Sequence, residues 1–190
     1  MGAAVLVPVK SFRRAKLRLA PVLDLPARQM LVRHMASLVV AAAYPLPVTV
    51  VCDDDDVAAW ATGVGASVVW APAPGLDRAV GCGVAALADA GFTRVVVAHG
   101  DLPLAHGLSL LAPGPGVTLV PDRHDFGTNV AVIPATSGFR FSYGPGSFDR
   151  HRHEAERLGL GARVVREPAL AWDVDDPADL DLPCGVATCS

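Results

Sequence analysis

The stretch VVVAHGDLPLA, residues 95–105, joins a short apolar run to a carboxylate and then to a proline. Three consecutive valines bounded by turn residues are typical of a strand buried on both faces of a sheet. Asp101 follows that run, and Pro103 ends the strand because proline lacks the N–H group that a sheet requires. Open α/β sheets bind ligands beyond the carboxyl ends of their strands, so the stretch predicts a buried strand that presents Asp101 to a ligand.

Similar apolar runs, rich in β-branched residues, alternate along the chain with longer stretches of helical periodicity. This alternation predicts an α/β fold with a mostly parallel, mixed central sheet. The expected strands are residues 3–9, 47–52, 66–70, 93–98, 117–120, 128–133 and 162–166. The expected helices are residues 26–43, 56–62 and 76–90, followed by a helix with Ser147 as its N-cap.

Length and composition predict a single globular domain. The chain has 190 residues, of which 52% are hydrophobic and 18% charged, and its mean hydropathy is +0.38. Such a chain can bury a large core without disulfides or metal ions. We expect one domain over residues 1–182 and a flexible tail over residues 183–190. The surplus of apolar residues is also compatible with a homodimer.

Charge and targeting patterns exclude several classes of partner. The formal net charge of −3, without a run of Lys or Arg interleaved with aromatic residues, argues against nucleic acid. The longest uncharged segment, residues 35–52, is interrupted by Pro45 and Pro47, which argues against a transmembrane helix. No secretory signal pattern precedes the first strand. Small-molecule partners and a cytoplasmic location are therefore expected.

A second acidic group lies in WDVDDPADL, residues 172–180. Side chains two residues apart in an extended segment point to the same side, so Asp173 and Asp175 could bind one cation together. Ligands that supply only oxygen suit Mg²⁺. Asp176 and Pro177 form the pattern of a helix N-cap, and the alternative that the neighbouring aspartates only flank this cap stays open.

A basic segment follows the first expected strand. Its five basic residues are Lys10, Arg13, Arg14, Lys16 and Arg18. A charge run of this kind can be a solvated loop. Its place at the carboxyl end of the first strand favours instead a site for phosphate groups.

Three other polar features have simple structural interpretations. YGPGSF, residues 143–148, is a turn that could also offer N–H groups to an anion at a helix start. The aspartates at 53–56 are expected to seat the first turn of the following helix. His34 is expected to pack in the core. His151 and His153 lie two residues apart, on different faces of a helix, and are expected at the surface.

Six segments, taken in order, resemble the guanylyltransferases that activate phospholactate or phosphoenolpyruvate during synthesis of a deazaflavin redox coenzyme. They are VPVKSFRRAKLRLAPVL, GLDRAV, HGDLPL, DRHDFGTNVAVIP, FSYGPGSFDRHRHEAERLGL and WDVDDPADL, and together they span nearly the whole chain. The resemblance implies the nucleotidyltransferase fold, which is similar to that of nucleotide-diphospho-sugar transferases and is Rossmann-like.

The resemblance also implies a role for particular residues. The metal ligands would be Asp101, Asp173 and Asp175; the contacts to the phosphorylated acid would be Thr128, Gly144 and Ser147; the nucleotide contacts would be Lys10, Lys16, Arg18 and Asp77. Lys16 would also take part in catalysis. Asp77 departs from the asparagine that the family pattern leads us to expect, and a carboxylate there can accept a hydrogen bond but not donate one.

The implied reaction fits these residue types. A phosphate oxygen of the acid would attack the α-phosphorus of GTP and release pyrophosphate. A phosphomonoester is already largely dianionic near neutral pH, its second pKa being about 6, so no general base is needed. Two Mg²⁺ ions and the basic segment would offset the charge of the approaching polyanions.

Two alternatives remain open on the sequence. A metal-dependent glycosyltransferase also uses an Asp-x-Asp pattern to hold a nucleotide sugar, and a catalytically inactive nucleotide-binding module would bind GTP without turnover. The sequence also leaves open whether the acid is phosphoenolpyruvate, phospholactate or phosphoglycerate. These acids differ only by small groups that the pocket must distinguish.

Overall fold

The computed structural model describes residues 2–72 and 75–183, and its strands form one sheet. Within these residues the strands are β1 (Ala3–Pro8), β2 (Val48–Cys52), β3 (Ser67–Trp70), β4 (Arg94–Ala98), β5 (Val117–Pro121), β6 (Thr128–Pro134) and β7 (Ala162–Val164). Their order across the sheet is β3-β2-β1-β4-β6-β5-β7. β6 runs antiparallel to β4 and β5, whereas the other paired strands are parallel. The predicted α/β fold, its mixed sheet and every expected strand are confirmed.

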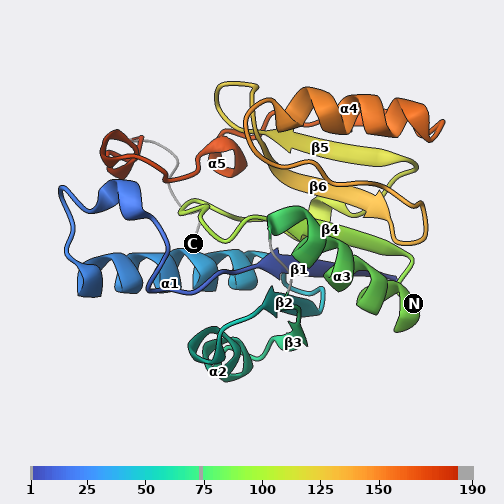
Figure 1. Ribbon diagram of the computed structural model, residues 1–190. Helices are drawn as coiled ribbons and strands as arrows, with labels where there is room; N and C mark the ends of the chain where they lie inside the picture. Colours follow the sequence, from blue (N-terminus) through green and yellow to red (C-terminus); the bar gives the residue numbers. More distant parts are fainter. Residues whose placement is uncertain (1, 73–74, 184–190) are drawn as a thin grey trace.

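Helices cover both faces of this sheet (Figure 1). The α-helices in the described ranges are α1 (Leu25–Ala42), α2 (Asp55–Gly63), α3 (Leu76–Asp89), α4 (Ser147–Arg157) and α5 (Pro168–Ala171), and the 3-10 turns are η1 (Leu17–Leu19), η2 (Leu108–Leu111) and η3 (Pro177–Leu180). α1, α2 and α5 contribute to the core on one face, and α3 and α4 contribute to the core on the other.

The two cores follow from the alternation of side chains along each strand. In β1, Val5 and Val7 enter the core that contains Met35 of α1, whereas Leu6 enters the core that contains Val80 of α3. All five side chains are fully buried. Burial on both faces explains why the central strands consist of continuous apolar runs rather than alternating polar and apolar residues.

The helix starts confirm two of the expected caps and correct a third. Asp54 accepts a hydrogen bond from the Val57 N–H at 3.2 Å, so the acidic run does cap the first turn of α2. Asp176 caps η3. The N-cap of α4 is Gly146 rather than Ser147, which is the first helical residue. Gly146 has φ of 74°, a left-handed conformation that glycine tolerates and that serine would adopt only with strain.

His34 is exposed, so its expected place in the core is wrong. The buried residues of α1 are Arg28, Val32, Met35, Ala36 and Val39, which recur with the period of one helical face. Position 34 falls outside that stripe.

The carboxyl ends of β1, β2 and β4 meet at one edge of the sheet, where the antiparallel β6 begins. The backbone N–H of His99, just beyond β4, donates to the carbonyl of Asn129 in β6 at 3.0 Å. The segment after β4 and the start of β6 are therefore adjacent. This edge is where open α/β sheets bind ligands.

Cys52 and Cys82 are free thiols. Two expectations from the sequence have only partial outcomes. No helix in the described ranges is long and apolar enough to cross a bilayer. The expected tail falls almost entirely on residues 184–190, which lie outside the described residues. The domain boundaries and the homodimer stay predictions.

Candidate active site

Lys16 joins two aspartates that come from distant parts of the chain. Its ammonium Nζ lies 2.5 Å from Asp101 Oδ2 and 2.7 Å from Asp175 Oδ1. Lys16 belongs to the loop after β1, Asp101 to the segment after β4, and Asp175 to the segment that precedes η3. Three of the residues expected at the site therefore meet at the edge of the sheet.

The Lys16 backbone adopts the left-handed conformation, with φ of 52° and ψ of 45°. This region costs a non-glycine residue roughly 1 kcal/mol and is found mainly where surrounding contacts enforce it. Here the conformation directly precedes η1, and the side chain is only 11% exposed. The loop is thus held in a strained form that brings the ammonium to the two carboxylates.

The electrostatics of this group follow from burial and mutual attraction. Burial alone would lower the pKa of Lys16, but the adjacent Asp101 and Asp175 raise it above its ordinary value. Burial would raise the pKa of Asp101, but Lys16 and His99 hold it below the usual range. Both groups therefore stay charged at neutral pH. Asp101 Oδ1 is nevertheless buried without a hydrogen-bond partner in the described residues.

Asp173 lies beside this pair in a different environment. Its Oδ1 accepts a hydrogen bond from Asn129 Nδ2 at 3.4 Å. Burial, followed by repulsion from the nearby Asp101 and Asp175, raises the pKa of Asp173 from its ordinary value of 3.8 to about 6. Three carboxylates thus share a small volume that contains one ammonium group.

The acidic segment is held in place by backbone and side-chain contacts. The Val174 N–H donates to the Asp101 carbonyl at 3.2 Å, which ties the segment to the end of β4. Asp179 Oδ2 accepts hydrogen bonds from the N–H groups of Asp175, at 2.8 Å, and Asp176, at 2.7 Å. Asp179 is buried, and its place in the cap of η3 therefore also fixes the backbone at Asp175.

Arg123 supports the same segment from the other side and was not expected at the site. It forms an ion pair with Asp179, and its Nη1 donates to the Asp173 carbonyl at 3.1 Å. Its guanidinium also lies over the Trp172 ring, 4.4 Å from the centroid. The sequence gives little indication of this role. The residues around Arg123, DRHD at 122–125, form no pattern that predicts a contact with a segment fifty residues further along the chain.

A cavity of about 750 Å³ opens beside the Lys16 cluster. Its polar lining includes Lys10, Ser11, Arg14, Lys16, Arg18, Asp53, His99, Asp101 and Asp175, and its apolar lining includes Pro8, Val9, Val51, Ala71, Leu76 and Ala79. The volume is in the range of small-molecule sites. Four of the five basic residues after β1, all but Arg13, therefore border this cavity.

Thr128, Gly144 and Ser147 do not line this cavity; Ser147 contacts Gly144 directly, and Thr128 contacts His151, about one turn further along α4. The Ser147 N–H donates to the Gly144 carbonyl at 3.0 Å, in a turn where Gly144 has φ of 102° and Gly146 has φ of 74°. These left-handed values require glycine at both positions. Thr128 and Ser147 are almost fully buried.

The expectation of a surface position for His151 is wrong. The side chain is fully buried and hydrogen-bonded at both ring nitrogens, to the Ser142 N–H and to Thr128 Oγ1. His153 is exposed, as expected. The buried face of α4 is formed by Ser147, Phe148, His151 and Ala155. The spacing from Phe148 to Ala155 could have identified His151 as a member of this face.

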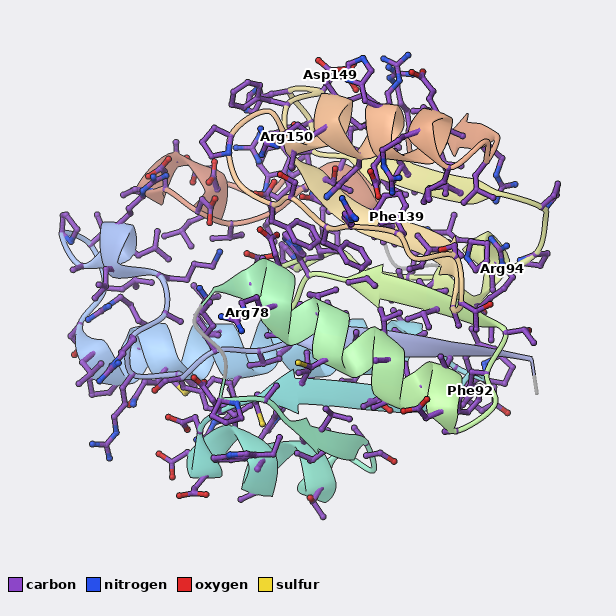
Figure 2. All side chains as sticks on the ribbon, turned by 45° about the vertical axis from the view of Figure 1, so that its right-hand side comes forward. Arg78, Phe92, Arg94, Phe139, Asp149 and Arg150 are labelled. Atoms are coloured by element: carbon purple, nitrogen blue, oxygen red, sulfur yellow. The ribbon has the colours of Figure 1, made fainter. Side chains whose placement is uncertain are left out.

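Arg150 shapes the loop that leads into α4. Its guanidinium donates to the carbonyls of Ser142 at 2.8 Å and Pro145 at 2.6 Å, and more weakly to those of Tyr143 and Gly144. Figure 2 shows the Arg150 side chain beside this loop, at the first turn of α4. Four successive carbonyl groups thus converge on one cation, so the turn keeps a defined shape.

Asp77 contacts this loop rather than the cavity. Its Oδ1 accepts a hydrogen bond from the Tyr143 N–H at 2.7 Å, and Asp77 does not line the cavity. The predicted nucleotide contact of Asp77 stays a prediction. An asparagine could accept the same hydrogen bond, so the contact gives no reason for the carboxylate found here.

Within residues 2–72 and 75–183, no group of three or more His, Cys, Asp or Glu side chains is arranged as a ready-made metal site. At Asp101 and Asp175, the Lys16 ammonium lies between the two carboxylates, in the place that a metal ion would need. The metal ligands expected from the sequence are therefore brought together as a cluster but stay a prediction as ligands.

Comparison with known proteins decides the family. The profile described as "Guanylyl transferase CofC like" matches residues 3–182. This chain belongs to that family. A phosphoenolpyruvate guanylyltransferase from Roseiflexus castenholzii is 37% identical over 185 residues, which cover 95% of this chain and 87% of the relative. Another, from Sphaerobacter thermophilus, is 33% identical over 196 residues, which cover 98% and 95% of the two chains.

Solved structures support the same fold for this CofC-like guanylyl transferase. A Desulfovibrio desulfuricans protein assigned as a nucleotide-diphospho-sugar transferase superposes with a TM-score of 0.75 at 18% sequence identity. The match covers 94% of this chain and 84% of that one. The nucleotidyltransferase fold implied by the sequence is thereby confirmed. The chain is a nucleotidyltransferase of the guanylyltransferase class.

Proposed function

We propose that the chain transfers the guanylyl group of GTP to a small phosphorylated carboxylic acid and releases pyrophosphate. The observation that carries this proposal is the meeting of Lys16, Asp101 and Asp175 at the mouth of a cavity lined by basic residues. Phosphoenolpyruvate is the first acid to test, because similar proteins carry the name phosphoenolpyruvate guanylyltransferase. Phospholactate is the second.

The reaction balances without an external base. A phosphate oxygen of the acid forms a bond to the α-phosphorus of GTP, and the bond from that phosphorus to the oxygen bridging to the β-phosphate breaks. The phosphomonoester is already mostly deprotonated near neutral pH. Catalysis therefore depends on alignment of the two polyanions and on compensation of their charge.

The basic side chains around the cavity would bind the triphosphate. Lys10, Lys16 and Arg18 all line it, and the first and last are exposed. The Lys16 ammonium would neutralise negative charge that builds up on the departing pyrophosphate. Arg18 also lies 3.7 Å from Asp176, a solvent-exposed contact that contributes little and is easily exchanged for a phosphate.

The acid would bind at the adjoining turn. Gly144 supplies an exposed backbone just before α4, where the helix dipole favours an anion. Ser147 and Thr128 would supply hydroxyl groups. Arg150 fixes the shape of the turn from within.

The carboxylate cluster is chemically suited to Mg²⁺. Asp101 Oδ1 is buried without a partner in the described residues, and burial, followed by repulsion from Asp101 and Asp175, raises the pKa of Asp173. A divalent cation would satisfy that oxygen and relieve that repulsion, and Asp101, Asp173 and Asp175 would supply only the oxygen ligands that Mg²⁺ prefers. Bound Mg²⁺, as two ions, would neutralise phosphate charge during the transfer.

The test is a matrix of nucleotides and acids. The purified chain is incubated with Mg²⁺, one of GTP, ATP, CTP or UTP, and one of phosphoenolpyruvate, phospholactate or phosphoglycerate, and pyrophosphate is measured. Release only with GTP and one acid, together with a dinucleotide product, supports the proposal. Transfer from a nucleotide sugar would favour a glycosyltransferase, and GTP binding without turnover an inactive module; either result rejects it.

A further inference from the structure

His151 is a fully buried histidine whose two ring nitrogens have different hydrogen-bond partners. The Ser142 N–H lies 2.9 Å from Nε2, and Thr128 Oγ1 lies 3.0 Å from Nδ1. A backbone N–H can only donate, so Nε2 must be the unprotonated nitrogen of the ring. The neutral imidazole then carries its proton on Nδ1 and donates it to Thr128 Oγ1.

The surroundings of His151 keep the ring neutral. Phe139, Phe141 and Tyr143 place their ring centroids 5.7, 6.0 and 5.0 Å from that of His151. Figure 2 shows Phe139 beneath α4, on the side of the helix that faces the interior. Burial, and then the charges of His99 and Arg150, lower the pKa of His151 to about 4. One tautomer is therefore present throughout the neutral pH range.

This tautomer determines what the Thr128 hydroxyl can do. A hydroxyl has one proton to donate and two lone pairs. Because His151 already donates to the oxygen, the Thr128 proton is directed to another acceptor. Thr128 begins β6, and His151 joins its hydroxyl to Ser142 in the loop that leads into α4. The available donor therefore lies near that loop.

We propose that His151 is a positioning residue that fixes the Thr128 hydroxyl as a hydrogen-bond donor to the phosphorylated acid. This inference rests on the proposed function, which supplies the acid as the acceptor. The acceptor is an anionic oxygen, because a hydroxyl donor beside an exposed glycine turn at a helix start matches a phosphate or carboxylate. His151 itself does not touch the substrate.

Two substitutions of His151 separate its two hydrogen bonds. Counted from Cβ, the amide of asparagine reaches the position of Nδ1, and the amide of glutamine reaches the position of Nε2. His151→Asn can keep the donor to Thr128 and loses the acceptor for Ser142, whereas His151→Gln does the reverse. Both remove the ring from the same aromatic surroundings, so each is the packing control for the other.

The primary measurement is the KM for phosphoenolpyruvate and for GTP in the wild type and the variants. Thr128→Val and His151→Gln should each raise the acid KM about tenfold, which is the size expected for loss of one hydrogen bond to a charged group. The GTP KM should stay within about twofold. His151→Asn should stay within about threefold of the wild type for both substrates, and the Thr128→Val/His151→Gln double variant should be no worse than either single variant.

Several results would overturn the inference. These are equal rises of the acid KM in His151→Asn and His151→Gln, a parallel rise of the GTP KM, or additive effects in the double variant. If the His151 variants unfold at the assay temperature, Thr128→Val and Thr128→Ser decide the matter. The valine variant must raise the acid KM and the serine variant must not.

Binding of phosphoenolpyruvate in the absence of GTP, measured as a shift in the melting temperature, separates this inference from the proposed function. If the acid stabilises the wild type but no pyrophosphate is released, the proposed function is rejected. The positioning role is still supported if that stabilisation is lost in Thr128→Val and His151→Gln and kept in His151→Asn. A wild type with normal turnover whose variants keep the wild-type acid KM rejects the positioning role only. A wild type that neither binds nor turns over any acid rejects both.

Discussion

Lys16 Nζ lies 2.5 Å from Asp101 Oδ2, although the two residues are 85 positions apart in the sequence. The contact joins the basic loop after β1 to the carboxylate after β4, and the second contact to Asp175 brings in the segment before η3. Lys16 thus occupies the place where a divalent cation would join the same carboxylates. We infer that a triphosphate with its metal ions would draw this ammonium away from one or both aspartates.

Replacement of Lys16 should affect stability and turnover together. Lys16→Met leaves the Asp101 carboxylate buried without its partner, which should lower the free energy of unfolding by about 2 kcal/mol. Loss of the charge facing the leaving pyrophosphate should lower kcat by at least about 100-fold. Urea denaturation and pyrophosphate release measure the two effects. Lys10→Met is the control for stability, because Lys10 is exposed; an equal loss of stability there would contradict the account.

Asp173 should make the metal-free protein less stable as the pH rises. Its pKa is about 6 in the folded chain and near 3.8 when unfolded, so the folded state retains a proton that the unfolded state releases. The stabilisation is complete below about pH 3.8 and is lost as the pH rises through about 6. At one pKa unit per 1.4 kcal/mol, Asp173→Asn should be up to about 3 kcal/mol more stable than the wild type at pH 7.5.

Denaturation curves at pH 3.5 and pH 7.5, in the presence of a chelator, measure this effect. The two proteins should differ little at pH 3.5. Added Mg²⁺ should stabilise the wild type and not Asp173→Asn if the carboxylate is a ligand. An advantage of Asp173→Asn that is the same at both pH values would show that the substitution acts through something other than charge.

Asp179 should matter for catalysis although it is not expected to contact a substrate. Its carboxylate accepts from the Asp175 and Asp176 N–H groups and pairs with Arg123. Asp179→Asn weakens these bonds, so the protein should lose about 2 kcal/mol of stability and most of its turnover. Asp181→Asn, two residues further on and exposed, is the matched control. Equal activity of the two variants would exclude a positioning role for Asp179.

Arg150 should control affinity for the acid through the shape of the turn before α4. Arg150→Met removes the donor shared by the carbonyls of Ser142 and Pro145, so the acid KM should rise about tenfold. Arg152→Met is the control, since Arg152 lies on the same helix and contacts only Asp149 and Phe148 in the described residues. A rise of the acid KM in both variants would point to a general effect on α4.

The sequence was sufficient for the parts of the fold that depend on local patterns. Valine-rich runs identified the strands, and the place of Asp101 after one of them predicted its position at the ligand-binding edge. The site could be predicted only in part. Arg123 and Asp179 pair across 56 residues, and no local pattern indicates such a contact. Sequence reasoning therefore found the carboxylates but not the residues that hold them.

His151 was misjudged for a different reason. The two-residue spacing to His153 places the two histidines on different faces of the helix but does not say which face is buried. The position three residues after Phe148 and four before Ala155 is what places His151 on the inner face of α4. A polar residue within an apolar stripe was the available signal, and it marks a residue that needs hydrogen-bond partners inside the protein.

The most direct test of the account compares pyrophosphate release from GTP and phosphoenolpyruvate, with Mg²⁺, by the wild type, Asp101→Asn and Asp175→Asn. Each substitution removes one negative charge and changes the side chain little in shape, so both variants should keep the wild-type circular dichroism spectrum. The account predicts that each loses at least about 100-fold in turnover. Turnover close to that of the wild type in both variants would show that the transfer does not depend on these carboxylates.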